Sequence, residues 1–208
     1  MYWRSGSCHL LLGGMKRVAI TGGIGSGKST VCRAISALAG VPIYDSDRRA
    51  KEIMDSDGKV REELIALFGE RVFEGGVLNR PLIASQVFGD EALLAKLNAI
   101  VHPRVVADFE HWAESQVCDY VILESALLFT SPLVGHYDLA VVVDAPVEMR
   151  ISRCVARDGL SAEQIERRIA NQMPSEEMRT RADVVVEADG RDLRSAVEEI
   201  DRIIRNIR

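Results

Sequence analysis

The sequence predicts an α/β fold built on a five-stranded parallel sheet, and two observations lead to this prediction. Short apolar segments alternate with stretches of helical period, which is typical of a parallel sheet covered by helices. A glycine-rich turn joins the first apolar segment to a helix, so the first strand, the helix and the second strand form a right-handed βαβ unit. The five predicted strands are residues 18–20, 41–44, 121–123, 139–143 and 183–186.

The glycine-rich turn has the spacing of a P-loop and predicts a site for ATP. Residues 22–29 match Gly-x-x-x-x-Gly-Lys-Ser, with a strand before and a helix after. Glycines let consecutive N–H groups point at phosphate oxygens, and the helix N-terminus adds partial positive charge. Lys28 can reach the outer phosphates, and the Ser29 hydroxyl can hold Mg²⁺. The predicted ATP-binding residues are Gly23, Ile24, Gly25, Ser26, Gly27, Lys28, Ser29 and Thr30. The fold class is therefore a P-loop NTPase three-layer fold.

Composition limits the possible partners of the chain. It has 208 residues, 47% of them apolar, and a net charge of −5, which disfavours a nucleic-acid-binding surface. No apolar run is long enough to span a bilayer, and the cysteines are too widely spaced for a disulfide framework. We expect a cytoplasmic protein, a monomer or weak homo-oligomer, without membrane partners. Residues 1–14 are expected to be a disordered extension, because Met15 followed by Lys16-Arg17 resembles a natural start.

A long helical segment interrupts the predicted sheet. Residues 48–116 contain no convincing strand and carry apolar stripes of helical period. This is too long for one crossover between two strands, so we expect a helical insertion that binds the second substrate. The nucleotide-binding core then comprises residues 15–47, 117–146 and 182–208.

The segment 147–181 is predicted to be a helical lid rich in arginine. Arg153 and Arg157 lie four residues apart, on one face of a helix. Arginines suit a lid that closes over polyphosphate and neutralises its charge. Acidic residues are interleaved with them, so a solvated charged face is the alternative. Arg157 is the first candidate for the phosphates, and Arg153 is the second.

Carboxylates follow two of the predicted strands. Glu124 ends the third strand, where a Walker B carboxylate would help to hold Mg²⁺, although an ordinary strand-end carboxylate fits equally well. Asp45 and Asp47 follow the second strand and would project to the same side of an extended chain. Asp47 is the best candidate to orient an acceptor hydroxyl. The alternative is that Asp47 is the N-cap of a helix starting at Arg48.

From Met15 onward, the chain resembles the dephospho-coenzyme A kinase family, whose motifs occur here in the family's order. These motifs are Thr21-Gly-Gly-Ile-Gly-Ser-Gly-Lys-Ser-Thr30, Tyr44-Asp-Ser-Asp47, Leu78-Asn-Arg80, Leu97-Asn-Ala-Ile-Val-His-Pro103, Leu127-Leu-Phe129, Arg153 with Arg157 and Gln172, and Ala182-Asp-Val-Val185. The resemblance departs from the family pattern at Ala126, Thr130 and residues 187–190.

The resemblance implies ATP-dependent phosphorylation of the ribose 3′-hydroxyl of dephospho-coenzyme A, the last step of coenzyme A biosynthesis, with Mg²⁺. Asp47, Lys28 and Arg157 would be catalytic, and Arg80 and His102 would bind the coenzyme. For His102 the alternative is a structural residue beside a Pro-initiated helix, and for Arg80 an ion pair at a helix entry.

Other functions are compatible with the same fold. The nearest is a P-loop kinase acting on a nucleoside, nucleotide or other small alcohol, although the long insertion favours a bulky acceptor. A GTPase-like switch would need a guanine-reading Asn-Lys-x-Asp, which does not occur in the sequence. An ATP-binding protein without chemistry is disfavoured by the presence of Lys28, Ser29, Asp47 and Arg157.

Overall fold

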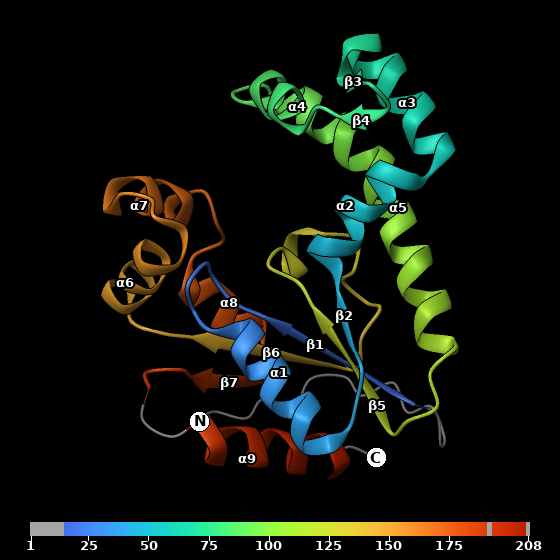
Figure 1. The fold of residues 1–208 in the computed structure, drawn as a ribbon. Coiled ribbons are helices and arrows are strands. Elements are labelled where there is room, and N and C mark those ends of the chain that lie inside the picture. The colour runs from blue at the N-terminus through green and yellow to red at the C-terminus, as the bar shows by residue number, and fades with distance from the viewer. Residues whose placement is uncertain (1–14, 191–192, 207–208) are drawn as a thin grey trace. The chain divides into compact units, whose positions relative to one another are not determined.

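The computed structural model describes residues 15–190 and 193–206, and it contains the predicted five-stranded parallel sheet (Figure 1). The strand order is β2-β5-β1-β6-β7. The bounds are β1 (Lys16–Thr21), β2 (Ile43–Asp45), β5 (Tyr120–Glu124), β6 (Leu139–Asp144) and β7 (Val184–Glu187). All five predicted strands are confirmed. The expected extension of residues 1–14 lies outside the described residues.

The chain forms two compact units. The first runs up to Asp45 and resumes at Ala113, and the second is Ser46–Trp112. The sequence-based expectation placed the insertion at 48–116, so the second unit begins two residues earlier and includes Asp47.

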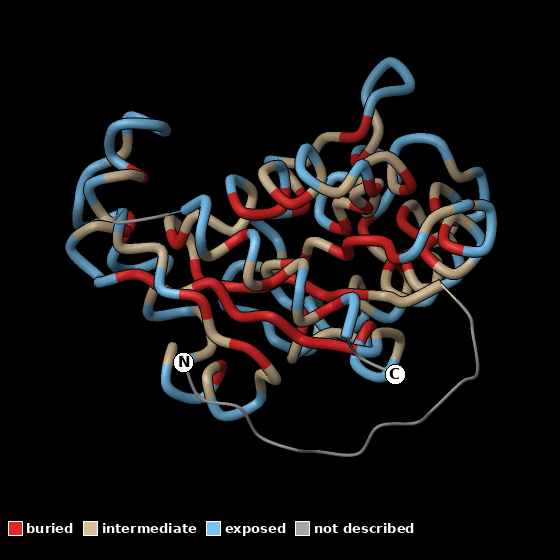
Figure 2. Tube along the Cα trace, turned by 90° about the horizontal axis from the view of Figure 1, so that it is seen from below, coloured by how far each residue is buried: buried red, intermediate tan, exposed pale blue. Residues whose placement is uncertain are grey.

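Two helices cover one face of the sheet in the first unit. These are α1 (Lys28–Ala39) and α9 (Leu193–Asn206), and they pack on alternate residues of the strands, such as Val18, Ile122 and Val141. The residues between them, such as Ala19, Leu123 and Val142, are equally buried and face the opposite side. Figure 2 shows this as continuous buried stretches of chain. Burial on both faces explains why the strands are apolar runs instead of alternating sequences.

The predicted lid segment is helical in the structure. It contains α6 (Val147–Asp158), α7 (Ala162–Ala170) and α8 (Ser175–Arg181). Gly159 ends α6 in the left-handed conformation with φ of 67°, as a glycine at this position allows. Ser161 and Gln164 form the capping box that starts α7.

The second unit is mostly helical. It contains α2 (Ser46–Ser56), α3 (Gly58–Phe68), the 3₁₀ turn η1 (Glu70–Val72), α4 (Arg80–Val87) and α5 (Glu91–Glu114), the last of which ends in the first unit. It also contains a short antiparallel hairpin, β3 (Phe73–Glu74) and β4 (Val77–Leu78). The expectation of no strand here was therefore wrong. Gly75 and Gly76, both with positive φ, form the two-residue turn of this hairpin.

Helix α5 corrects a second expectation. It continues for 24 residues through Pro103, so no helix starts beside His102. The proline removes one N–H from the helix ladder. However, Val101, Val105 and Phe109 are buried at four-residue spacing on both sides of it, and this common apolar face keeps the helix continuous. None of the described helices combines the length and apolarity needed to cross a membrane.

Replacing Ile200 with Ala is expected to lower the free energy of unfolding by about 2–5 kcal/mol. Ile200 is 0% exposed and lies in the cluster between α9 and the sheet, where a shortened side chain leaves a cavity. Urea denaturation followed by circular dichroism measures the change. The matched control is Val117→Ala, since Val117 is 102% exposed and its truncation should change stability by no more than about 0.5 kcal/mol. Equal effects of the two substitutions would contradict this assignment of the core.

Candidate active site

The P-loop connects the end of β1 to the start of α1, and its backbone fits tightly against its neighbours. A Cβ atom on Gly22 would lie 2.2 Å from the carbonyl oxygen of Val143. A Cβ atom on Gly25, whose φ is +75°, would lie 2.4 Å from the carbonyl oxygen of Arg150. Both obstacles are backbone atoms that cannot rotate away, so these two positions require glycine.

The loop leaves a row of backbone donors for a ligand. The N–H of Ser26 donates to the Gly23 carbonyl at 3.1 Å, and the N–H of Ile24 donates to Gln172 Oε1 at 2.8 Å. In contrast, the N–H groups of Gly25, Gly27, Lys28 and Ser29 have no acceptor among the residues that the structure describes. Ser26 Oγ is buried and likewise has no partner within that part of the chain. Donors at a helix N-terminus fit a phosphate chain.

Ser29 and Glu124 meet next to this loop, at the carboxyl end of strand β5. The Ser29 hydroxyl donates a hydrogen bond to Glu124 Oε1. Asp45 is the partner of Glu124 in the parallel register of β2 and β5, which brings a second carboxylate to the same end of the sheet. Burial and the charge of Glu124 raise the pKa of the nearby Cys32 thiol, so no thiolate competes there. A hydroxyl and carboxylates are hard oxygen donors, and this set fits Mg²⁺, which commonly takes its remaining ligands from phosphate and water.

Substituting Gln for Glu124 is expected to raise the Mg²⁺ concentration needed for half-maximal activity by about 10–100-fold. The amide keeps an acceptor for the Ser29 hydroxyl but removes the negative charge. Initial rates over a Mg²⁺ titration at saturating ATP measure the effect. Glu198→Gln, an exposed change on α9 beside Arg194, is the control and should leave the titration unchanged. An unaltered titration for Glu124→Gln would make Glu124 an ordinary strand-end carboxylate.

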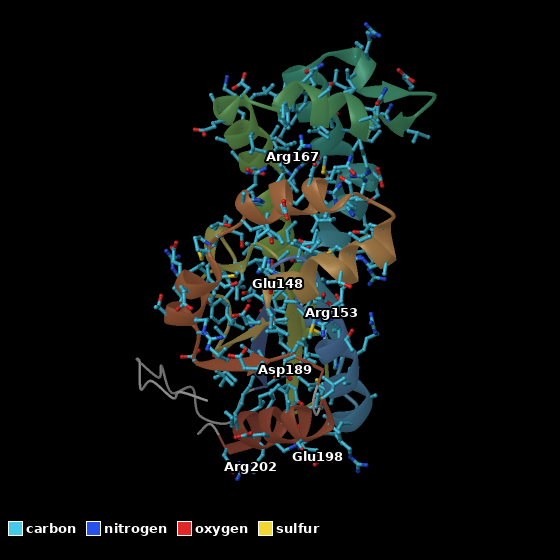
Figure 3. The ribbon with its side chains drawn as sticks, turned by 90° about the vertical axis from the view of Figure 1, so that its left-hand side faces the viewer. Glu148, Arg153, Arg167, Asp189, Glu198 and Arg202 are labelled. Carbon is cyan, nitrogen blue, oxygen red and sulfur yellow. The ribbon has the colours of Figure 1, made fainter. Side chains whose placement is uncertain are left out.

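The structure brings Arg153 to the P-loop and leaves Arg157 at the surface. Arg153 Nη1 donates to the carbonyls of Gly25 and Ser26 at 3.4 and 3.2 Å, and Nη2 donates to Ala188 O at 2.8 Å. Figure 3 shows Arg153 beside the first turn of α1. Arg157 is 63% exposed and pairs with Asp158 at 2.7 Å, so in this conformation Arg153 contacts the loop and Arg157 does not.

Sequence reasoning missed Arg150 as a site residue. Its side chain is buried and Nε donates to the carbonyl of Ile24 at 3.0 Å. Arg150 precedes Arg153 by three residues on α6, so both project from the same helix face. That spacing is the sequence signal that could have identified it.

Asp47, Arg80 and His102 belong to the second unit. Helix α2 begins at Ser46, so Asp47 lies inside its first turn, and the alternative of an N-cap before Arg48 is wrong. Arg80 Nη2 donates to Asp55 Oδ2 at 2.8 Å and to Lys51 O at 2.9 Å, which attaches the start of α4 to α2. Partial burial lowers the pKa of His102, so its imidazole is neutral at pH 7.

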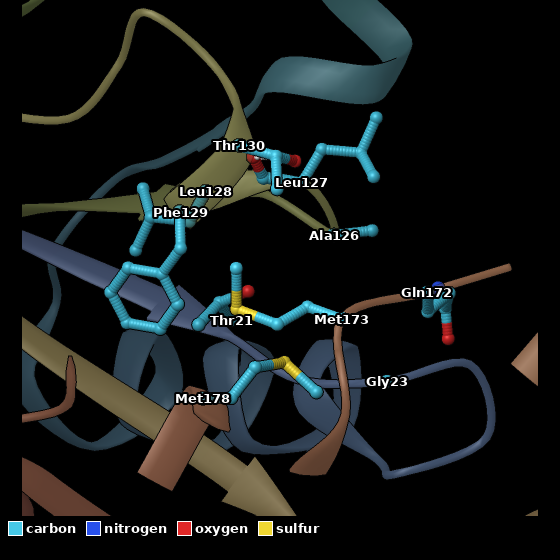
Figure 4. A pocket seen from close by; sticks show the side chains of 10 residues that line it. All are labelled: Thr21, Gly23, Ala126, Leu127, Leu128, Phe129, Thr130, Gln172, Met173 and Met178. Carbon is cyan, nitrogen blue, oxygen red and sulfur yellow. Dashed lines mark hydrogen bonds between the residues drawn. The ribbon is translucent and has the colours of Figure 1, made fainter. Parts of the chain in front are cut away.

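Two pockets adjoin the P-loop. The first is lined mainly by apolar groups, and it lies between the start of α1 and the turn after β7, beside Gly27 and Arg153. Its other lining residues are Thr30, Val31, Val186, Glu187, Ala188, Gly190, Leu193 and Ala196. The second pocket lies on the other side of the loop, where Met173 and Met178 meet Thr21 and Phe129 (Figure 4). Two of the positions that depart from the family pattern, Ala126 and Thr130, line this second pocket.

The comparisons with known proteins agree with this geometry. A family model described as Dephospho-CoA kinase matches residues 16–193. The chain belongs to the dephospho-CoA kinase family. A relative named dephospho-CoA kinase from Bacteroides fragilis strain YCH46 is 43% identical over 175 residues, which are 84% of this chain and 85% of that protein.

Two solved structures are similar to this chain in fold. The crystal structure of TT1252 from Thermus thermophilus has a TM-score of 0.80 and 37% identity, and the match covers 92% of this chain and 96% of that one. Dephospho-CoA kinase from Campylobacter jejuni has a TM-score of 0.66 over 90% of this chain and 96% of its own, at 22% identity. The second likeness concerns the fold alone. The predicted P-loop kinase fold is therefore confirmed, and the family resemblance found in the sequence is confirmed as well.

Proposed function

We propose that this protein transfers the γ-phosphoryl group of ATP to the 3′-hydroxyl of dephospho-coenzyme A, giving coenzyme A and ADP. The observation that carries the proposal is the match of nearly the whole chain to the dephospho-CoA kinase family. It is supported by a P-loop whose backbone N–H groups at Gly25, Gly27, Lys28 and Ser29 have no acceptor among the described residues.

The donor half of the site consists of residues in the first unit. The N–H groups of Gly25, Gly27, Lys28 and Ser29 bind the phosphate oxygens, and the Lys28 ammonium neutralises charge on the outer phosphates. Ser29 and Glu124 would hold Mg²⁺, which supplies further neutralisation of phosphate charge when it is bound. The apolar pocket beside Gly27 and Ala188 receives the adenine base.

Helices α6 and α7 would act as the lid over the phosphates. Arg153 already contacts the loop carbonyls of Gly25 and Ser26. Arg157, held by Asp158 at the surface, would turn inward when the lid closes and would stabilise the charge that develops on the transferred group.

The acceptor half of the site includes Asp47. Its carboxylate would accept the proton of the 3′-hydroxyl, or orient that hydroxyl for attack on the γ-phosphorus. Arg80 and His102 would contact the coenzyme. A neutral His102 can serve as a hydrogen-bond donor at one ring nitrogen and as an acceptor at the other. A kinase for a smaller alcohol or a nucleotide is the competing function.

Comparing acceptors distinguishes the two functions. The protein is assayed for ADP release with ATP, Mg²⁺ and either dephospho-coenzyme A, a nucleoside monophosphate or shikimate. We expect kcat/KM for dephospho-coenzyme A to exceed the values for the other acceptors by about 10³-fold or more, because a smaller acceptor would leave the proposed coenzyme-binding groups Arg80 and His102 without their contacts. A higher kcat/KM for a nucleoside monophosphate would overturn the proposal.

We also propose that the protein is located in the cytoplasm. The proposal is supported by its thiols, since Cys32, Cys118 and Cys154 are not in disulfides.

A further inference from the structure

Arg150 carries a buried charge whose role lies outside the chemistry described so far. It is 4% exposed and is the one charged side chain among the buried residues of the described part of the chain. Burial lowers the pKa of its guanidinium, and the charge of Asp144 opposes this effect. A charge in this environment is stable only when its donors are paired, so the partners of Arg150 indicate what it does.

One set of partners is the P-loop. Arg150 Nε donates to the Ile24 carbonyl at 3.0 Å. Its guanidinium lies directly under Gly23, where a Cβ atom would be only 2.1 Å from Nη2. The carbonyl oxygen of Arg150 lies under Gly25 in the same way. Residues 23–25 of the loop therefore pack directly against Arg150.

The contact with Ile24 also determines the direction of a backbone N–H group that can donate to a phosphate oxygen. In a planar trans peptide, the C=O of one residue and the N–H of the next point in opposite directions. The Ile24 carbonyl is turned toward Arg150, so the N–H of Gly25 is directed away from Arg150. Arg153 orients the N–H of Gly27 in the same way, because it binds the carbonyl of Ser26, the preceding residue. Gly25 and Gly27 supply two of the donors without an acceptor in the described structure.

A second set of partners connects Arg150 to α8. Its Nη1 donates to Ser175 Oγ at 3.2 Å, at the first residue of α8, and Ser175 Oγ donates to Asp144 Oδ1 at 3.2 Å. Arg179 on α8 also binds Asp144, at 3.1 Å, and Glu187 at the end of β7, at 2.6 Å. These bonds form a continuous polar network from the P-loop through Asp144 to α8.

We propose that Arg150 is a positioning residue that aims the Gly25 N–H at the phosphate chain by holding the Ile24 carbonyl, and that it connects this loop to α8 through Ser175. The inference rests on the proposed function only in taking ATP as the ligand of the loop. The Nε and Nη1 donors of Arg150 are directed at protein acceptors, so we assign it to holding the loop and not to a contact with the phosphates.

The test separates binding of the phosphate chain from binding of the base. Affinities for a non-hydrolysable ATP analogue and for AMP are measured by titration calorimetry with wild type, Arg150→Met and the control Arg202→Met. AMP is informative because it lacks the outer phosphates that the loop binds. We expect Arg150→Met to weaken binding of the ATP analogue about tenfold and to leave AMP binding within about twofold, as loss of one well-placed donor implies. Arg202 is exposed on α9, and its substitution should change neither affinity.

A second variant covers the case in which Arg150→Met does not fold. Arg150→Lys keeps a positive donor for the Ile24 carbonyl but cannot also reach Ser175 with the fork of a guanidinium. We expect it to fold and to weaken binding of the ATP analogue about threefold, with AMP binding unchanged. If ATP-analogue and AMP affinities fall together in the folded variants, or if neither falls, the proposal is overturned. The measurement uses no acceptor, so its outcome is independent of whether dephospho-coenzyme A is the substrate.

Discussion

Asp47→Asn is expected to lower kcat by about 10²–10⁴-fold and to leave the affinity for ATP nearly unchanged. The amide has almost the same shape as the carboxylate but cannot accept the proton of the attacking hydroxyl. Asp47 lies in the first turn of α2, immediately after the sheet strand that ends at Asp45, so the substitution alters no residue of the P-loop. Steady-state kinetics with both substrates varied, together with calorimetric titration of an ATP analogue, measure the two quantities separately.

The control for Asp47→Asn is Asp119→Asn. Asp119 is largely exposed and binds Arg205 at 2.9 Å at the start of β5, so its substitution should leave kcat within a factor of about two. Turnover that is unchanged in Asp47→Asn would show that Asp47 is a structural residue of the first helical turn. A parallel loss of ATP affinity would instead indicate that the substitution disturbs the donor half of the site.

Lys28→Ala has the second of the two largest expected effects. We expect kcat to fall by about 10²–10³-fold, because a cation aimed at the transferred phosphoryl group is lost from the site. ATP affinity should fall too, since under the proposed function the same ammonium would contact the phosphates of bound ATP. Lys28 is the first residue of α1, and its backbone N–H also has no acceptor among the described residues, so the backbone contribution remains in the variant.

The control for Lys28→Ala is Lys59→Ala at the exposed start of α3. Melting temperatures of both variants close to that of wild type would show that any loss is local to the site. A Lys28→Ala enzyme with wild-type kcat and wild-type KM for ATP would contradict the assignment of this loop as the phosphate-binding site.

The sheet and the P-loop were predictable because their signals are local. Each strand is an apolar run of a few residues, and burial on both faces is what makes it apolar. Likewise, the glycines at 22 and 25 are required by backbone atoms that lie only 2.2 and 2.4 Å from the positions of a missing Cβ. Because these requirements are local, the same residue types are needed at the same spacing, and the rest of the sequence does not change them.

The details of the second unit were less predictable. Pro103 suggested a helix start, but the apolar face shared by Val101, Val105 and Phe109 continues through it. The hairpin at residues 73–78 has only two residues in each strand, too few for an alternating pattern to be visible. Its Gly75-Gly76 turn was the one available signal.

The contacts of Arg150 and Arg153 with the P-loop are tertiary contacts that no local pattern encodes. Arg150, Arg153 and Arg157 have the same chemistry and lie within two turns of α6. Only the folded chain shows that the first two contact loop carbonyls while the third pairs with Asp158. The assignment of Arg157 to the phosphates stays a prediction.

The most direct test of the proposed function is the identity of the product. The wild-type protein is incubated with ATP, Mg²⁺ and dephospho-coenzyme A, and the products are analysed by ³¹P NMR and by liquid chromatography with mass spectrometry. We predict one new phosphomonoester on the ribose 3′-hydroxyl, identical to authentic coenzyme A, formed in equimolar amount with ADP. Release of ADP without a phosphorylated coenzyme, or a phosphate at any other position, would contradict the proposed function.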